Sequence, residues 1–202
     1  MFGAVSYAAA SNGLRRYETV DDIPAVMFRK RATVRGRVTR VTDGDTVRVR
    51  HEPRLRSAPR ESLKVRLMAV DAPETAKWGN EGQPLGETAK AFVEDRLADK
   101  RVTVKLLSRD RYGRAVGRVT YRGGLWNLRK RDIQEELLAN GLASVYRGRG
   151  AQYDDPANSS HHWDAIEAHA KKRQLGIWKD IEANDPAKYK AKIRRKQEKI
   201  NK

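Results

Sequence analysis

The stretch Val34-Arg-Gly-Arg-Val-Thr-Arg-Val41, followed closely by Thr46-Val-Arg-Val-Arg50, decides how this chain begins to fold. Apolar and basic residues alternate along both segments, which is the pattern of half-buried β-strands. The link between the two segments is Asp43-Gly44, a residue pair that favours a turn. The sequence therefore predicts a β-hairpin in a folded domain that begins near Ala32.

Further strands and helices are predicted after the hairpin. Residues 51–61 contain two prolines and no periodic pattern, so we expect an exposed loop. The segment 63–69 then alternates as a third strand, which places Arg66 on the face opposite to the apolar residues. Apolar residues recur at helical spacing over 85–97, and strand patterns return over 102–106 and 115–121.

Two more helices are predicted in the last part of the chain. The apolar residues of the first lie over 128–138, and this helix should end at Asn140-Gly141. Those of the second lie over 163–170, and this helix should end near Gly176. Three strands, a helix, two strands and then helices fit an α+β fold, with a five-stranded Greek-key barrel of the OB type and about three packed helices. We expect an N-terminal extension over 1–31, this barrel domain over 32–180 and a basic tail over 181–202.

The charge balance points to a polyanionic partner. Lys and Arg number 43 against 26 Asp and Glu, a formal net charge of +17, which favours nucleic acid first and an anionic membrane surface second. The chain has no cysteine, which excludes a disulfide framework, a thiolate zinc site and a cysteine nucleophile. The sequence indicates no obligate protein partner.

Localisation stays open at this level. No apolar run approaches the ~20 residues that a bilayer-spanning helix needs, so we expect the chain as given to be soluble. No acidic residue precedes Glu18, and the stretch before it is weakly similar to an organelle transit peptide. A mitochondrial or membrane-associated protein and a plain flexible N-terminus are the alternatives.

Three short motifs carry the chemistry. They are Asp43-Gly-Asp-Thr46, Arg66 to Thr75 with its Asp71-Ala-Pro-Glu74 core, and Asp110-Arg-Tyr-Gly-Arg114. Carboxylates suit a hard cation, which takes oxygen ligands, and arginines suit a phosphodiester, which a guanidinium can clamp with two parallel charged hydrogen bonds. The motifs therefore indicate metal-dependent attack on phosphate.

In this order the motifs resemble those of the staphylococcal nuclease (thermonuclease) family. The resemblance covers roughly 32–180 and includes Asn140-Gly-Leu-Ala143 and Leu175-Gly-Ile-Trp178. The lead from Arg15 to Arg31 is more weakly similar to the membrane-anchored fungal branch of these nucleases. The resemblance implies a calcium-dependent nuclease that hydrolyses DNA and/or RNA with little sequence specificity, leaving 3′-phosphate and 5′-hydroxyl ends.

The resemblance also implies a metal site. Its calcium ligands would be the carboxylates of Asp45 and Asp71 and the backbone carbonyl of Ala72. Ca²⁺ accepts such oxygen ligands at about 2.3–2.6 Å in loose geometry. Ala72 stands where the best-known member of the family has a threonine, a change that a carbonyl ligand should tolerate.

Three further residues match the family's catalytic positions. Glu74 would deprotonate or position the attacking water, and as a simple alternative it would be a surface residue capping a turn. Arg66 and Arg114 would hold the scissile phosphate and oppose the charge of the transition state. Their alternatives are a strand residue paired with an acid for Arg66 and an ordinary surface charge for Arg114.

Four residues fill supporting positions. Asp43 and Thr46 would orient Asp45 or metal-bound water, while capping of an Asx-type turn is a compatible second role. Tyr112 would contact the nucleotide, or else pack on its own hairpin. Arg111 would add a phosphate contact or remain a solvated charge.

Two other classes of function remain as alternatives. A noncatalytic nucleic-acid-binding OB module would keep the barrel and lose acids or arginines of the motifs, and here all are present. A module that docks on anionic membranes through the basic tail is the second. A nuclease assay separates both from an enzyme.

Overall fold

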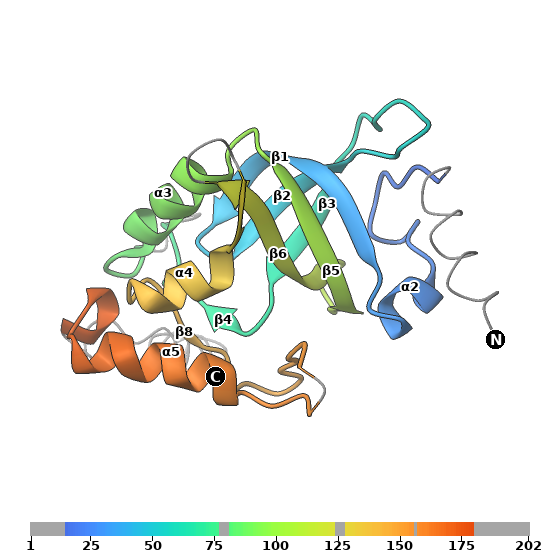
Figure 1. Ribbon diagram of the computed structural model, residues 1–202. Helices are drawn as coiled ribbons and strands as arrows, with labels where there is room; N and C mark the ends of the chain where they lie inside the picture. Colours follow the sequence, from blue (N-terminus) through green and yellow to red (C-terminus); the bar gives the residue numbers. More distant parts are fainter. Residues whose placement is uncertain (1–14, 77–80, 124–127, 156, 180–202) are drawn as a thin grey trace, which may run out of the picture. The chain divides into compact units, whose positions relative to one another are not determined.

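The computed structural model describes residues 15–76, 81–123, 128–155 and 157–179 (Figure 1). The chain divides into two compact units. The barrel unit comprises Met1–Val41, Thr46–Leu67 and Arg96–Ile133, and the helical unit comprises Thr42–Asp45, Met68–Asp95 and Gln134–Lys202. The basic tail expected over 181–202 lies outside the described residues.

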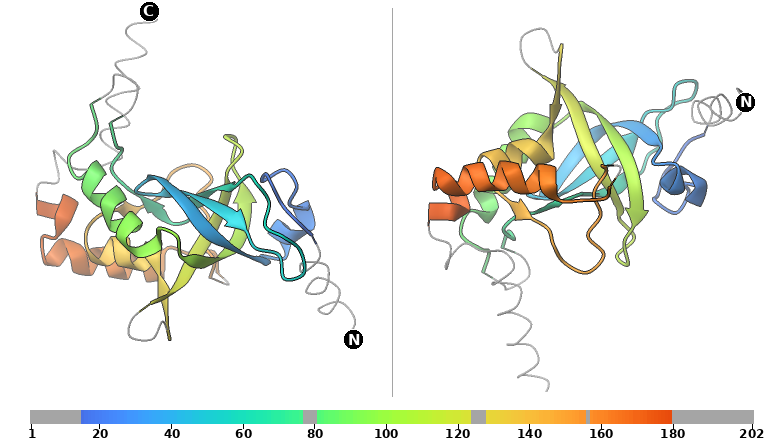
Figure 2. Two further views of the ribbon diagram at one scale, coloured as in Figure 1. Left: turned by 90° about the horizontal axis from the view of Figure 1, so that it is seen from above. Right: turned by 60° about the horizontal axis from the view of Figure 1, so that its bottom comes forward.

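Five strands of the barrel unit form a closed barrel. They are β1 (Thr33–Asp43), β2 (Thr46–His51), β3 (Leu63–Leu67), β5 (Arg101–Arg109) and β6 (Ala115–Gly123). Hydrogen bonding follows the order β3-β2-β1-β5-β6, and a parallel pairing of β3 with β6 closes the ring (Figure 2). The last two residues of β1 belong to the helical unit. The predicted hairpin and the predicted five-stranded OB-type barrel are confirmed.

Alternation along the strands builds the interior of this barrel. In β3, Leu63, Val65 and Leu67 are buried, whereas Lys64 is exposed and Arg66 is half-buried. On β1, a Cβ at Gly36 would lie 2.3 Å from the backbone oxygen of Arg50, so only glycine allows β1 to approach β2 this closely.

Two local predictions are wrong. Residues 129–132 form strand β7 (Arg129–Asp132) beside β6, and helix α4 covers only Ile133–Ala139. The three residues Arg129 to Arg131 are exposed and offer a helix no apolar face, while the pairing with β6 satisfies their backbone. The third strand ends at Leu67 rather than at residue 69, because Ala69 adopts a positive φ of 60°.

The helical unit contains a small two-stranded sheet and most of the helices. Strand β4 (Val70–Asp71) pairs with β8 (Ser144–Val145), and helix α5 (His161–Lys172) lies beside β8. Helix α3 (Gly86–Leu97) precedes them in the chain, and the short helix η2 (Gly176–Lys179) follows. In the described part of the chain, none of the helices combines the length and apolar character needed to cross a membrane.

Two glycines allow the chain after α4 to contact the start of η2. Gly141 and Gly176 have φ values of 65° and 53°, and the amide of Ile177 donates to the Gly141 oxygen at 2.8 Å. A Cβ on Gly141 would lie 2.1 Å from the backbone oxygen of Leu175. The predicted helix end at Asn140-Gly141 is confirmed, whereas α5 ends at Lys172 and Gly176 is the first residue of η2. Close backbone contact requires glycine at both positions.

The segment 15–31, within the expected N-terminal extension, packs into the barrel unit. Tyr17, Val20 and Ile23 are buried, and the short helix α2 (Ala25–Arg29) lies beside β5 (Figure 1). The Tyr17 amide donates to Nδ1 of buried His51 at 3.1 Å, and the two rings stack at 4.8 Å between centroids. His51 is therefore an acceptor in its neutral form.

The burial of His51 makes folding stability depend on pH. Burial lowers the pKa of His51 from 6.5 to about 4. Between pH 6.5 and about 4, His51 is therefore protonated in the unfolded chain and neutral in the folded chain. We expect His51 to remove on the order of 3 kcal/mol of stability as pH falls from about 6.5 to about 4. Urea unfolding of the wild type and of His51→Gln, which keeps an acceptor but does not titrate, measures the difference. Parallel pH dependence of the two proteins would contradict this role.

Candidate active site

The Asp43 carboxylate joins the two acidic motifs within the helical unit. Its Oδ1 atom accepts hydrogen bonds from the amides of Gly44, at 3.0 Å, and Thr75, at 3.3 Å. A Cβ on Gly44 would lie 2.8 Å from the Cβ of Ala72 and 3.0 Å from that of Ala89, so the turn has room only for glycine. The loop that carries Asp45 is thereby packed against the loop that follows Asp71.

The second motif is held at both of its ends. Asp71 lies in β4 opposite Ser144, and the Ser144 hydroxyl donates to the Asp71 backbone oxygen at 3.5 Å. Glu74 is half-buried, and its backbone amide donates to Oε1 of Gln83 at 2.9 Å. The backbone amide of Gln83 in turn donates to the backbone oxygen of Glu74 at 2.8 Å. The backbone on either side of Ala72 is therefore fixed.

The donor chemistry of this region fits a hard cation. Asp43, Asp45 and Asp71 are all buried in the helical unit, with exposed fractions of 6%, 4% and 4%. In residues 15–76, 81–123, 128–155 and 157–179, no group of three or more His, Cys, Asp or Glu side chains has an arrangement that could hold a metal ion. The donor set implied by the resemblance is smaller, with two carboxylates and one backbone carbonyl, and consists of oxygen alone.

Arg66 and Thr46 are cross-strand partners in the barrel unit. The two residues face each other in the antiparallel pairing of β2 with β3, and both are half-buried. Directly opposed residues of two strands have neighbouring side chains on the same face. The prediction that Arg66 points away from the apolar interior is confirmed.

Arg114 is anchored by an acid of its own turn. Its Nε donates to Oδ2 of Asp110 at 2.6 Å, and its Nη1 donates to the hydroxyl of Thr46 at 3.4 Å. Oδ1 of Asp110 accepts the amides of Tyr112 at 2.8 Å and Arg114 at 3.0 Å. The Arg114 side chain is 23% exposed and is therefore mostly covered by its surroundings.

The sequence motif contained Asp110, but its anchoring role was not predicted. Burial raises the pKa of Asp110, and hydrogen bonds from the Arg114 and Tyr112 amides and from the Arg114 guanidinium outweigh that effect, so the net pKa is lowered. An aspartate at the first position of an Asp-x-x-Gly-x turn is the signal that identifies such a residue. The role of Gln83 was also not predicted, because its side chain bonds the backbone of Glu74 across a loop that has no periodic sequence pattern.

Tyr112 presents an exposed ring between two arginines. The side chain is 61% exposed, and the guanidinium carbons of Arg111 and Arg114 lie 4.9 and 5.3 Å from the ring centroid. Nη2 of Arg111 also donates to the Tyr112 hydroxyl at 2.6 Å. The ring thus contacts two arginines of its own turn and still leaves most of its surface exposed.

Comparisons with known proteins agree with the motifs. The family described as staphylococcal nuclease homologue matches residues 64–180. "Endonuclease Htp3" of Saprolegnia parasitica is 42% identical over 186 residues, covering 88% of this chain and 85% of that protein. "Probable endonuclease LCL3" of Komagataella phaffii is 34% identical over 194 residues, covering 87% and 82%. The protein with the same description in Debaryomyces hansenii is 36% identical over 191 residues, covering 86% and 78%.

The chain belongs to the staphylococcal nuclease family. The family match covers more than half of the chain, and the first of these relatives shares 42% identity over most of both proteins. Family membership and the names of the relatives support a nuclease, an enzyme that hydrolyses phosphodiester bonds of nucleic acids.

The Asp43 contacts lead to a stability prediction. Asp43→Ala leaves the buried amides of Gly44 and Thr75 without this acceptor, at a cost of about 2–4 kcal/mol. Asp43→Asn keeps an oxygen acceptor and should lose about 1 kcal/mol. Urea unfolding of the two variants measures the difference. Equal stability of the alanine and asparagine variants would contradict the role of the Oδ1 acceptor.

Proposed function

We propose that this chain is a calcium-dependent nuclease that hydrolyses phosphodiester bonds of DNA and/or RNA with little sequence specificity. The observation that carries the proposal is the Asp43 carboxylate, which packs the Asp45 loop against the Asp71 loop in a chain of this family. Phosphate and sugar contacts carry no sequence information, which accounts for low base selectivity.

Asp45, Asp71 and the carbonyl of Ala72 would hold the calcium ion. Both carboxylates are buried, so they are shielded from bulk water and suited to a cation rather than to solvent. Bound there, calcium supplies Lewis-acid polarisation of a phosphoryl oxygen and eases formation of hydroxide.

The remaining residues act on water and on phosphate. Glu74 accepts a proton from the attacking water, or orients that water, as its oxygen bonds to phosphorus. Arg66 and Arg114 donate hydrogen bonds to the phosphoryl oxygens and stabilise the charge that develops on them. The bond from phosphorus to the 5′ oxygen breaks, and that oxygen takes a proton from water, which leaves 3′-phosphate and 5′-hydroxyl ends.

Residues of the β5–β6 turn would bind the nucleotide. Tyr112 offers its exposed face to a base, and Arg111 offers a second guanidinium to a neighbouring phosphate. Base–aromatic stacking tolerates any base and is worth roughly 1–3 kcal/mol. Unstacked, single-stranded substrate is therefore favoured.

A nuclease assay with purified full-length chain tests the proposal. Single-stranded DNA, duplex DNA and RNA are incubated with calcium, magnesium or chelator, and the product ends are identified. We expect cleavage with calcium, and a loss of about 10²–10³-fold in kcat for Glu74→Gln and Arg114→Ala. Glu87→Gln, at an exposed position of α3, is the matched control for Glu74→Gln and should cleave at the wild-type rate.

Two results would overturn the proposal. Wild-type cleavage rates in both Glu74→Gln and Arg114→Ala would remove the mechanism. Binding of all substrates without any cleavage would identify a noncatalytic nucleic-acid-binding module instead.

A further inference from the structure

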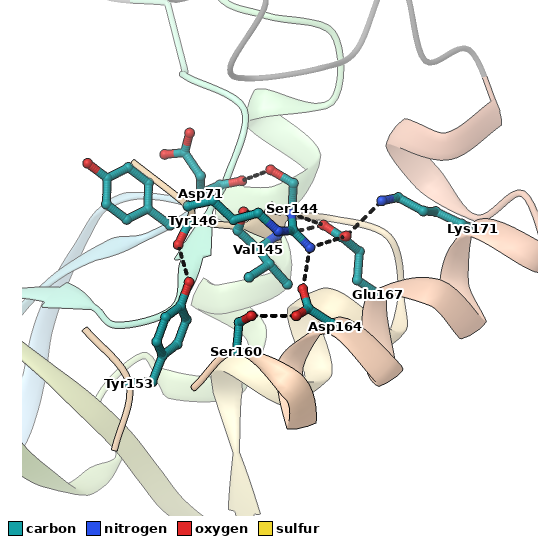
Figure 3. Close-up of polar contacts among 10 residues, drawn as sticks. Asp71, Ser144, Val145, Tyr146, Tyr153, Ser160, Asp164, Glu167 and Lys171 are labelled. Carbon is teal, nitrogen blue, oxygen red and sulfur yellow. Dashed lines mark hydrogen bonds and ion pairs between the residues drawn. The ribbon is translucent and has the colours of Figure 1, made fainter. Parts of the chain in front are cut away.

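The outer edge of strand β8 is bound by side chains of the helical unit (Figure 3). The amide of Tyr146 donates to the Ala69 oxygen at 2.8 Å on the side of β4. Because successive residues of a strand direct their peptide groups to opposite sides, the amide and carbonyl of Val145 point away from β4. This edge would ordinarily need another strand.

Two charged side chains take the place of that strand. Oε1 of Glu167 accepts the Val145 amide at 2.7 Å, and Nη1 of Arg147 donates to the Val145 oxygen at 3.2 Å. The two side chains also bond each other, from Nη2 of Arg147 to Oε2 of Glu167 at 2.8 Å. We name Glu167 and Arg147 the edge clamp, because together they satisfy both peptide groups of Val145.

The clamp is charged and tightly held. Glu167 is 2% exposed, and Lys171 donates to its Oε2 at 2.7 Å, while Arg147 also pairs with Asp164. Burial raises the pKa of Glu167, but hydrogen bonds from Arg147, Lys171 and Val145 outweigh burial and leave that pKa lowered. The hydroxyl of Tyr153 adds a hydrogen bond to the Tyr146 oxygen at 2.8 Å.

The opposite side of β8 leads to Asp71. Ser144 pairs with Asp71 in the β4–β8 ladder, and its hydroxyl donates to the Asp71 oxygen at 3.5 Å. A sheet of two strands with two residues each is only marginally stable by itself. The position of β4 therefore depends on what holds β8, and the clamp binds the outer edge of β8.

We propose that Glu167, acting with Arg147 through β8, is a positioning residue that sets the Asp71 carboxylate for metal binding. This role rests on the proposed function, since it takes Asp71 as a calcium ligand. Arg147 is 51% exposed, and an ion pair with an exposed member contributes little net stability, so placement of a strand is a better reason for the pair than stability. Loss of partners that orient a metal ligand typically weakens metal affinity by about 10–100-fold.

Calorimetric titration of calcium into the full-length chain tests this role. The proteins compared are the wild type, Asp71→Asn, Glu167→Gln and Lys171→Met. Glu167→Gln removes the charge that holds Arg147, whereas Lys171→Met removes a contact of Glu167 and leaves the bonds to Val145 in place. We expect calcium affinity to fall about 10-fold or more in Glu167→Gln and to stay within about twofold of wild type in Lys171→Met.

Amide hydrogen exchange without calcium supplies a second readout. Exchange at Val145 and Asp71 should accelerate in Glu167→Gln and not in Lys171→Met. If Glu167→Gln fails to fold, Arg147→Lys replaces it, because lysine keeps the charge and loses the guanidinium fork. The same loss of calcium affinity is then expected.

The outcomes separate the two proposals. If Asp71→Asn abolishes calcium binding while Glu167→Gln or its substitute binds as tightly as wild type, the positioning role is wrong and the metal site stands. If wild type itself binds no calcium, the proposed metal site fails, and the positioning role fails with it. Faster exchange at Asp71 combined with weakened calcium binding supports the role.

Discussion

A single carboxylate oxygen, Oδ1 of Asp43, is the constraint on which the arrangement of the acids depends. It receives the amides of Gly44 and Thr75, which are far apart in the sequence, and so ties the turn before Asp45 to the loop after Asp71. The absence of a side chain at Gly44 allows the same turn to pack on Ala72. This tie gives the two buried carboxylates of the helical unit a shared framework.

Three residues assigned to the proposed chemistry are held by neighbours that do not react. Gln83 binds the backbone of Glu74, and Asp110 binds Arg114. The edge clamp binds β8, which pairs with the strand β4 that carries Asp71. Groups fixed in this way lose little freedom when substrate binds, which would favour the proposed reaction. Few residues are assigned to the proposed reaction, and further residues hold them in position.

Much of the fold could be predicted because its strands have regular alternation. The hairpin around Asp43-Gly44, the face of Arg66 and the glycine after α4 all follow from short-range patterns. Strand β7 was missed, because its charged residues carry no apolar period and it forms only by pairing with β6. The roles of Gln83 and Glu167 were missed because their contacts join residues distant in sequence, which no local pattern reveals.

The central claim is the proposed reaction, in which Asp71 as a calcium ligand and Arg114 as a phosphate ligand both serve the hydrolysis of a phosphodiester bond. A double-mutant cycle of Asp71→Asn and Arg114→Ala, measured as kcat/KM on single-stranded DNA with calcium, tests it most directly. Residues that act as one unit have strongly non-additive effects. The account predicts that the double variant loses little more activity than the worse single variant. Losses that multiply in full would contradict it.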